Sequence, residues 1–271
     1  MKQKNKITFL IILLAAASVL VQSCGKDNMK YPSATLSGRF VYQGQQVGLL
    51  HTSPDIISGN SNGATMGFQQ VKGAQNVYGV NEVWVYTRHN GTFTAKFFNG
   101  EYLARTLQLK APFQDFEKKP VTVNGDTNLG DIEVVPYWWM SNLATTFTGG
   151  TGGATGVFTA TFNLTRPSVQ AGRTLQYVAV YLSPTDLPDA ASASQGAILT
   201  FNAGVNAGGI VVPAAASTGG AVTVRVDLST LTTGQKAFLA AQGPGGHIWA
   251  SVAVKTNGVA DALYSDAIKL Q

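Results

Sequence analysis

The stretch Phe158-Thr159-Ala160-Thr161-Phe162-Asn163-Leu164-Thr165 alternates without interruption between apolar and polar side chains. Successive side chains of a β-strand point to opposite faces, so this stretch presents one apolar face and one polar face. The same alternation recurs in residues 174–183, 222–228 and 247–255. Strands of this kind are typical of antiparallel sheets that pack face to face around a shared core. The C-terminal half of the chain is therefore predicted to be a β-sandwich.

Two segments between these strands have a different pattern. Residues 232–241 indicate a short helix with Phe238 and Leu239 as its buried side chains. Residues 187–220 are rich in Ala, Gly, Ser and Asn, which bury little apolar surface. We therefore expect one helix and one long, mostly irregular loop within an otherwise β-rich half.

The N-terminal half carries strand signals in shorter pieces. Strands are predicted at residues 35–42, 47–50, 82–88, 92–98, 101–109 and 129–135, and residues 53–72 are predicted to be a surface loop holding at most one strand. Asn90-Gly91 and Asn124-Gly125-Asp126 predict tight hairpins, because Asn and Gly tolerate the positive φ that such turns need. Trp84 and Tyr86 share one face of their strand and are predicted to pack against other residues. The N-terminal half is therefore also predicted to be β-rich.

Pro136 marks the predicted boundary between two domains, residues 33–135 and 136–271. Proline interrupts a strand-like run there and is a poor member of a central strand. The three residues that follow are Tyr137, Trp138 and Trp139. In a strand the first and third would share one face and the second would take the other, so both faces cannot be in water. We predict that these three aromatic residues form an interdomain contact.

The first 24 residues have the organisation of a lipoprotein signal peptide. Three lysines precede an apolar run at residues 7–21, and Ser23 precedes Cys24, the only cysteine in the chain. The run is shorter than the about 20 residues that a membrane-spanning helix needs. We predict that residues 1–23 are removed, that Cys24 is lipidated and anchors the protein to a membrane, and that residues 24–32 form a tether.

Composition and spacing then exclude several classes of function. Removing residues 1–23 removes three lysines and no acids, which lowers the net charge from +5 to +2, so we expect no nucleic-acid partner. With its one cysteine used for lipid, the folded chain has no thiol chemistry. His51, His89 and His247 lie far apart, and the acidic residues are scattered. We therefore expect no catalytic residues, no metal site and no cofactor, and we do not expect an enzyme.

Several short motifs together resemble one protein family. They are residues 31–44 (YPSATLSGRFVYQG), Val47-Gly48, Gly91-Thr92-Phe93, residues 98–102 (FNGEY) and Pro136-Tyr137. At these positions the chain is similar to Bacteroidetes lipoproteins of domain-of-unknown-function family 3823. The resemblance implies a transthyretin-like or carboxypeptidase-regulatory-like sandwich, followed by an immunoglobulin- or fibronectin-like sandwich. It also implies a place at the outer membrane, on its periplasmic or cell-surface face, near a SusC/SusD-type polysaccharide utilisation system, and it transfers no catalytic residue.

An immunoglobulin topology would place residues 174–183 beside residues 247–255 in one sheet. The outward faces of these strands would then bring four side chains together: Tyr177, Tyr181, His247 and Trp249. Sugar rings stack on aromatic faces and sugar hydroxyls bind polar groups, so this cluster would make a glycan platform. The alternative is that residues 187–220 or the first domain cover the same aromatic side chains. The sequence leaves both interpretations open.

The function predicted from these features is a non-catalytic outer-membrane lipoprotein that binds a glycan or a protein partner of a SusC/SusD-type system. The alternative is a fimbrillin-like structural or adhesin subunit, which polymerises by strand exchange. Strand exchange needs a removable first strand and a cleavable basic site close to it. Arg39 lies inside the predicted first strand and not in a loop, which argues against the fimbrillin-like alternative.

Overall fold

The computed structural model describes residues 31–50, 64–73, 82–149, 155–189, 219–241 and 247–270. The predicted signal peptide, Cys24, His51 and most of the predicted loop at 187–220 lie outside the described residues. Residues Ala34–Gln271 form one compact unit, and the predicted domain boundary at residue 135 stays a prediction. Within the described part of the chain, no helix is long and apolar enough to cross a membrane.

The first sheet is organised around an interior strand. It contains β1 (Ala34–Tyr42), β2 (Gln45–Gln46), β5 (Thr92–Phe97) and β8 (Thr127–Glu133). β5 pairs with β1 in antiparallel orientation, and β8 pairs with the other side of β1 in parallel orientation. The connection from β1 to β2 turns at Gln43 and Gly44, whose φ angles of 52° and 73° match a type I′ turn.

The second sheet packs against the first. It contains β3 (Ala64–Gly73), β4 (Val83–Tyr86), β6 (Gly100–Thr106) and β7 (Lys119–Val123), in the order β4-β3-β6-β7. β3 arises from the segment predicted to be mainly loop, yet it is an interior strand with Met66 and Phe68 buried. The rings of Phe68 and Phe97 lie 5.1 Å apart and join the two sheets. The N-terminal half is therefore a β-sandwich.

The two hairpins predicted for this half do not form as paired strands. Gly91 has a φ of 69°, and Thr87 and Phe93 make a single bridge across the turn. The strands on either side then separate, because β4 pairs with β3 while β5 pairs with β1. Asn124 to Asp126 likewise connects β7 to β8, which lie in different sheets. Turn residues allow the chain to reverse, but burial of an apolar face in each sheet decides which strands pair.

The C-terminal half confirms the predicted alternation. One sheet contains β9 (Trp139–Thr148), β10 (Val157–Thr165) and β12 (Gly220–Asp227); the other contains β11 (Leu175–Ser183), β13 (Trp249–Thr256), β14 (Ala262–Tyr264) and β15 (Ile268–Lys269). All strand pairs within these two sheets are antiparallel. The apolar side of β10, from Phe158 to Leu164, is at most 3% exposed, as the sequence pattern predicted.

The helix predicted at residues 232–241 is also confirmed. η2 (Leu228–Thr230) precedes α3 (Thr233–Ala241). Thr232 and Gln235 cap the helix reciprocally: the backbone N–H of Gln235 donates to Oγ1 of Thr232, and the backbone N–H of Thr232 donates to Oε1 of Gln235. Leu239 is buried, as predicted, whereas Phe238 is only partly buried.

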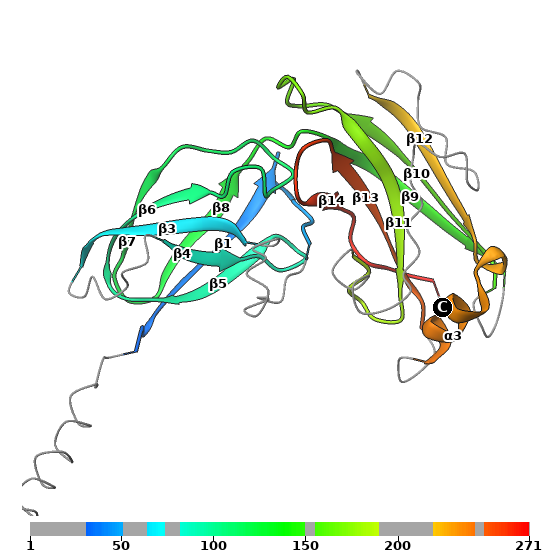
Figure 1. The fold of residues 1–271 in the computed structure, drawn as a ribbon, viewed down its shortest axis with the longest axis horizontal. Coiled ribbons are helices and arrows are strands. Elements are labelled where there is room, and N and C mark those ends of the chain that lie inside the picture. The colour runs from blue at the N-terminus through cyan, green and yellow to red at the C-terminus, as the bar shows by residue number, and fades with distance from the viewer. Residues whose placement is uncertain are drawn as a thin grey trace, which may run out of the picture. The chain divides into compact units, whose positions relative to one another are not determined.

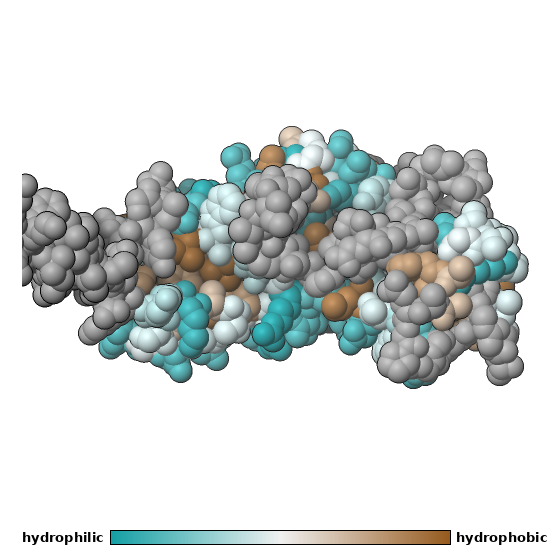
Figure 2. Space-filling model, turned by 60° about the horizontal axis from the view of Figure 1, so that its bottom comes forward, coloured by the Kyte–Doolittle hydropathy of each residue, from teal (hydrophilic) through white to brown (hydrophobic). Residues whose placement is uncertain are grey.

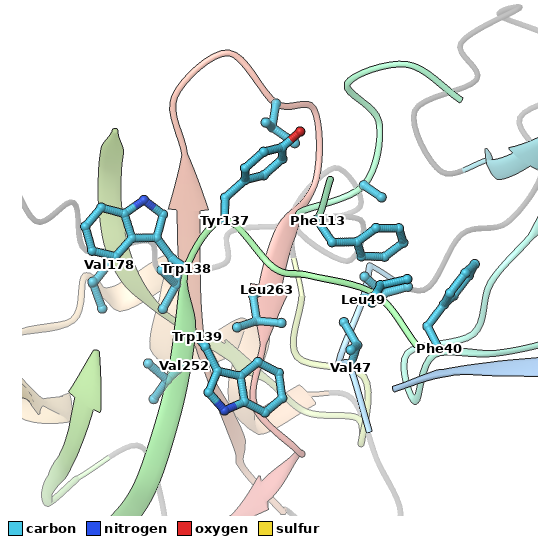
Figure 3. Close-up of a cluster of buried hydrophobic side chains, with 14 of the residues drawn as sticks. Phe40, Val47, Leu49, Phe113, Tyr137, Trp138, Trp139, Val178, Val252 and Leu263 are labelled. Carbon is cyan, nitrogen blue, oxygen red and sulfur yellow. The ribbon is translucent and has the colours of Figure 1, made fainter. Parts of the chain in front are cut away.

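Figure 1 shows the strands of both halves and α3 among the described residues. One continuous cluster of buried apolar side chains runs through both halves. Figure 3 shows Phe40 and Leu49 from the first half and Val252 from the second in this cluster, with Trp138 on the chain segment between the halves. The fold is therefore an all-β sandwich fold in which the buried core does not stop at Pro136.

Candidate ligand-binding surface

The predicted platform of Tyr177, Tyr181, His247 and Trp249 does not form one exposed surface. β11 and β13 are neighbours as expected, with Tyr181 opposite Ser251 in the register. Tyr181 is only 3% exposed, and its ring lies 5.8 Å from that of Tyr264. Leu50 from the first half packs against the same small cluster. Tyr181 is therefore covered partly by the first half of the chain, which was one of the two alternatives.

The other members of the predicted platform are partly buried. Tyr177 packs at the edge of the cluster that contains Tyr181, and their hydroxyl oxygens lie 3.3 Å apart. Nε2 of His247 lies 3.2 Å from Nζ of Lys269, and Trp249 pairs with Lys269 in the sheet. Tyr177 and Tyr181 therefore belong to one cluster, whereas His247 and Trp249 lie at the beginning of β13 beside Lys269.

The three aromatic residues after Pro136 are all buried. The Trp139 ring meets the Tyr42 ring edge-on at 5.1 Å. Nε1 of Trp138 donates to the backbone oxygen of Arg173, and the Arg173 guanidinium lies over the Tyr137 ring. The backbone N–H of Tyr137 donates to the oxygen of Pro112, and burial raises the pKa of the Tyr137 hydroxyl. These residues therefore contact both the preceding and the following sheets.

A buried polar cluster also connects the two halves, and nothing in the sequence pattern predicted it. Asp261 accepts hydrogen bonds from the backbone N–H groups of Leu50 at 3.2 Å and Ala262 at 2.7 Å. The pKa of Asp261 is raised to about 7, mainly by burial and to a smaller extent by the nearby Asp189, while these hydrogen bonds and Lys255 oppose the increase. Asp261 is only 3% exposed. It therefore acts as a contact within the fold and not as a surface group.

His89 belongs to the same cluster. Its Nε2 lies 3.2 Å from the backbone oxygen of Ser265, and a carbonyl oxygen can only accept, so Nε2 is the donor in a hydrogen bond between them. Nδ1 of His89 lies 3.9 Å from Oδ2 of Asp189, whose side chain is fully buried. No spacing along the chain signals this cluster, because its members come from loops and strand ends far apart in sequence.

Trp84 is different, because it faces outward. Figure 2 shows apolar residues reaching one face of the molecule in separate patches among polar residues. The large apolar side chains that are exposed in the described ranges are Tyr31, Val71, Trp84, Val135 and Val169. Trp84 is 46% exposed, so the prediction that it packs against other residues is wrong. Its neighbours in the strand, Val83 and Val85, point to the other face and carry the packing.

A row of residues crosses the second sheet from Trp84. In the β4-β3-β6 register, Trp84 lies opposite Gly67, and Gly67 lies opposite Arg105. Glu82 lies two residues before Trp84 and so shares its face. Oε1 of Glu82 accepts from Nε of Arg105 at 2.5 Å, and Oε2 accepts from Nη2 at 2.7 Å. These hydrogen bonds raise the pKa of Arg105 above its ordinary value.

Gly67 provides the space for this ion pair. A Cβ atom at position 67 would lie 2.7 Å from Oε2 of Glu82 and 3.1 Å from Cδ2 of Leu107. The Glu82 carboxylate therefore occupies the place that a larger residue would fill. Beside it, Nζ of Lys118 donates to Oε1 of Gln69 at 2.8 Å. We call Gly67, Gln69, Glu82, Trp84 and Arg105 the Trp84 surface.

The Trp84 surface combines an exposed aromatic ring with a two-point ion pair on rigid strands. The sequence signal for it was the placement of Glu82, Trp84 and Tyr86 on the face opposite Val83 and Val85. Its donors and acceptors suit hydrogen bonding to a ligand, not metal coordination. No group of three or more His, Cys, Asp or Glu side chains within the described ranges could hold a metal ion.

The fold and this surface define an all-β sandwich protein with a small aromatic and polar patch on one sheet. Residues 151–269 match the profile of the C-terminal DUF3823 domain, described as a domain of unknown function. This match covers the C-terminal part of the chain and agrees with the predicted resemblance to domain-of-unknown-function family 3823. No curated protein gives a significant match to the sequence.

Solved structures of similar fold come from species of Bacteroides and Parabacteroides. A DUF3823 family protein from Parabacteroides merdae is 24% identical, with a TM-score of 0.61 over 89% of this chain and 99% of the other. One from Bacteroides ovatus is 22% identical, with a TM-score of 0.57 over 88% and 98%. A candidate carbohydrate-binding protein from Bacteroides uniformis is 17% identical, with a TM-score of 0.60 over 89% and 99%. At these identities the similarity shows a shared fold.

Proposed function

We propose that this protein is a non-catalytic lipoprotein of the outer membrane that binds a glycan at the Trp84 surface. The observation that carries the proposal is Trp84 itself, 46% exposed on a sheet whose other described aromatic side chains are more buried. An exposed tryptophan forgoes the favourable free energy of burying its ring, and such a residue is typical of a contact surface.

The chemistry of the Trp84 surface suits a sugar. The face of an indole ring stacks on the C–H groups of a pyranose ring and excludes water from both. The Glu82 carboxylate, with lone pairs beyond those bound by Arg105, accepts hydrogen bonds from hydroxyl groups. Because Glu82 and Arg105 hold each other at two points, they are already oriented before a ligand arrives, which lowers the entropic cost of binding.

Two further observations support the proposal. The Bacteroides uniformis protein of similar fold is described as a candidate carbohydrate-binding protein. The lipoprotein signal around Cys24 supports an extracytoplasmic location, where polymeric glycans are met. The motif resemblance extends the proposal to an accessory role in a SusC/SusD-type polysaccharide utilisation system, with lipidated Cys24 as the membrane attachment.

We do not propose the fimbrillin-like alternative, because β1 is poorly suited to leave the fold. β1 pairs with β5 on one side and with β8 on the other. Its Leu36 and Phe40 side chains are fully buried in the core. Removing β1 would break its pairings with β2, β5 and β8 and expose these side chains, so strand exchange at this position would unfold the first sheet.

Affinity gel electrophoresis tests the proposal. Residues 25–271 retain the whole compact unit and are run through gels that contain single polysaccharides. We expect retardation by at least one polysaccharide, and we expect Trp84→Ala to abolish it because the stacking face is lost. Val169→Ala, at a site 81% exposed and outside the Trp84 surface, is the matched control and should bind like wild type. Unchanged retardation in Trp84→Ala would refute the Trp84 surface as the glycan site, and capture of an envelope protein without any glycan binding would favour a protein ligand.

A further inference from the structure

We infer that the Trp84 surface selects uncharged glycans over glycans that carry carboxylate or sulfate groups, because Glu82 already neutralises Arg105 and occupies its Nε–Nη2 edge. This inference rests on the proposed glycan binding and names the class of glycan. It depends on three features of the surface: the hydrogen bonds that Arg105 already makes, the charges around Arg105, and the space at Gly67 that the Glu82 carboxylate fills.

One of the two edges of the Arg105 guanidinium that suit an anion is taken by Glu82. A guanidinium binds a carboxylate best through two parallel N–H donors, and Arg105 gives Nε and Nη2 to Glu82 in this way. Nη1 lies 3.5 Å from the backbone oxygen of Thr106. The remaining N–H groups on Nη1 and Nη2 can each donate to a neutral hydroxyl. A ligand carboxylate would have to displace Glu82 from the Nε–Nη2 edge, or share Arg105 with Glu82 at the Nη1–Nη2 end and lie close to the negative charge of Glu82.

The charges around Arg105 also disfavour an anion. The Glu82–Arg105 pair is neutral as a unit, with side-chain exposures of 13% and 34%. Asp115 adds a second negative charge that acts on Arg105 and raises its pKa. The ammonium group of Lys118 on the same face is directed to Gln69, while Glu101 on β6 is exposed. The charges of Glu82, Arg105, Asp115, Lys118 and Glu101 sum to −1, so an approaching anion meets no net positive charge from these five residues.

Gly67 determines where the carboxylate of Glu82 lies. With no side chain at position 67, Glu82 reaches across β3 from the Trp84 side of the surface to Arg105. Adjacent strands lie about 4.8 Å apart, so Trp84 and Arg105 are separated by two such steps, roughly 10 Å between their backbones. Glu82 lies within this interval. A ring stacked on Trp84 therefore presents its hydroxyl groups to an acceptor that is fixed and charge-compensated.

Paired gels test the inference. Residues 25–271 are run in gels with neutral polysaccharides (soluble starch, galactomannan, arabinoxylan) and in gels with acidic ones (polygalacturonate, chondroitin sulfate). We expect wild type to be retarded by a neutral polysaccharide only. Glu82→Gln keeps the shape and one acceptor but leaves the Arg105 charge uncompensated, so we expect its affinity for an acidic polysaccharide to rise about tenfold. Val169→Ala should behave as wild type in every gel.

The outcomes separate the inference from the proposed function. Retardation of wild type by acidic polysaccharides, lost in Trp84→Ala, would overturn the inference and leave the proposed function intact. Retardation by no polysaccharide would overturn both. If Glu82→Gln fails to fold, the salt dependence of wild-type binding decides whether the bound glycan is charged. An uncharged ligand gives a dissociation constant that is nearly unchanged between low and high ionic strength, whereas a dissociation constant that increases several-fold with salt would contradict the inference.

Discussion

The backbone N–H of Leu50 donates a hydrogen bond of 3.2 Å to Oδ2 of Asp261, which lies 211 residues later in the chain. Asp261 also donates its own backbone N–H to the oxygen of Lys110. A single buried aspartate thus connects a loop after β2, a loop after β6 and the strand β14. Its protonation state should therefore affect the stability of the whole compact unit.

The free energy of unfolding should fall as the pH rises from 5 to 8. The folded-state pKa of Asp261 is raised from 3.8 to about 7, so between these values the folded chain holds a proton that the unfolded chain releases. The contribution of this proton to the free energy of unfolding is fully present below about pH 4 and is lost as the pH rises through about 7. We expect a loss of about 3 kcal/mol, measured by urea unfolding at both pH values.

Asp261→Asn is the matched variant for this prediction. It removes the titrating group, so the contribution of residue 261 to the slope between pH 5 and 8 should disappear. Asp126, Asp131 and Asp227 have lowered pKa values because of their hydrogen bonds, so they act below about pH 4, outside this window. An equal slope in wild type and Asp261→Asn would show that Asp261 is not the group responsible.

Trp138 should be among the most costly core residues to replace. It is 1% exposed, its indole N–H donates to Arg173, and it belongs to the buried cluster that runs through both halves. We expect Trp138→Ala to lower the free energy of unfolding by about 3–5 kcal/mol, and Trp138→Phe to lower it less, because less volume is lost. Urea unfolding followed by far-ultraviolet circular dichroism measures both.

The same cluster predicts one cooperative unfolding transition for Ala34–Gln271. Because buried residues of both halves share contacts, neither half can expose its side of the cluster without cost to the other. Near- and far-ultraviolet circular dichroism should give coincident urea transitions. Two separated transitions would instead show that the halves unfold independently.

Gly67→Ala should weaken glycan binding with little loss of stability. The new methyl group would meet the end of the flexible Glu82 side chain, which can move away, so we expect a change in unfolding free energy of about 1 kcal/mol or less. Glu82 would lose its two-point geometry with Arg105. Gly234→Ala is the matched control: Gly234 lies in α3 with open space around it, so this change should stabilise by up to about 1 kcal/mol and leave binding unchanged.

Cys24→Ser tests the proposed anchor. Without a thiol there is no site for the lipid. The full-length protein should therefore be absent from the outer-membrane fraction, or should be found there only in the form that keeps its leader. Envelope fractionation with an antibody against the protein measures this, and Val169→Ala serves as the control that should stay with the membrane. Unchanged outer-membrane association and leader removal in Cys24→Ser would contradict lipidation at this residue.

The sequence by itself determined the all-β class, four strands of the C-terminal half (β10, β11, β12 and β13) and the helix α3. Alternation in β10 and β12 reports directly which face is buried, because the period of a strand is two residues. The Thr232–Gln235 capping pair is also local, because its two partners lie three residues apart in the chain. The resemblance to domain-of-unknown-function family 3823 also followed from short motifs that can be read without any tertiary contact.

Only the tertiary structure decided which turns join paired strands and which aromatic side chains meet water. Asn90-Gly91 has the chemistry of a hairpin, yet its flanking strands enter different sheets, because pairing depends on burial across the whole sandwich. Trp84 and Tyr181 occupy similar places in their strand patterns, yet Leu50 and Tyr264 pack with Tyr181 while Trp84 stays exposed. What covers a sheet face comes from distant parts of the chain, so no local pattern can report it.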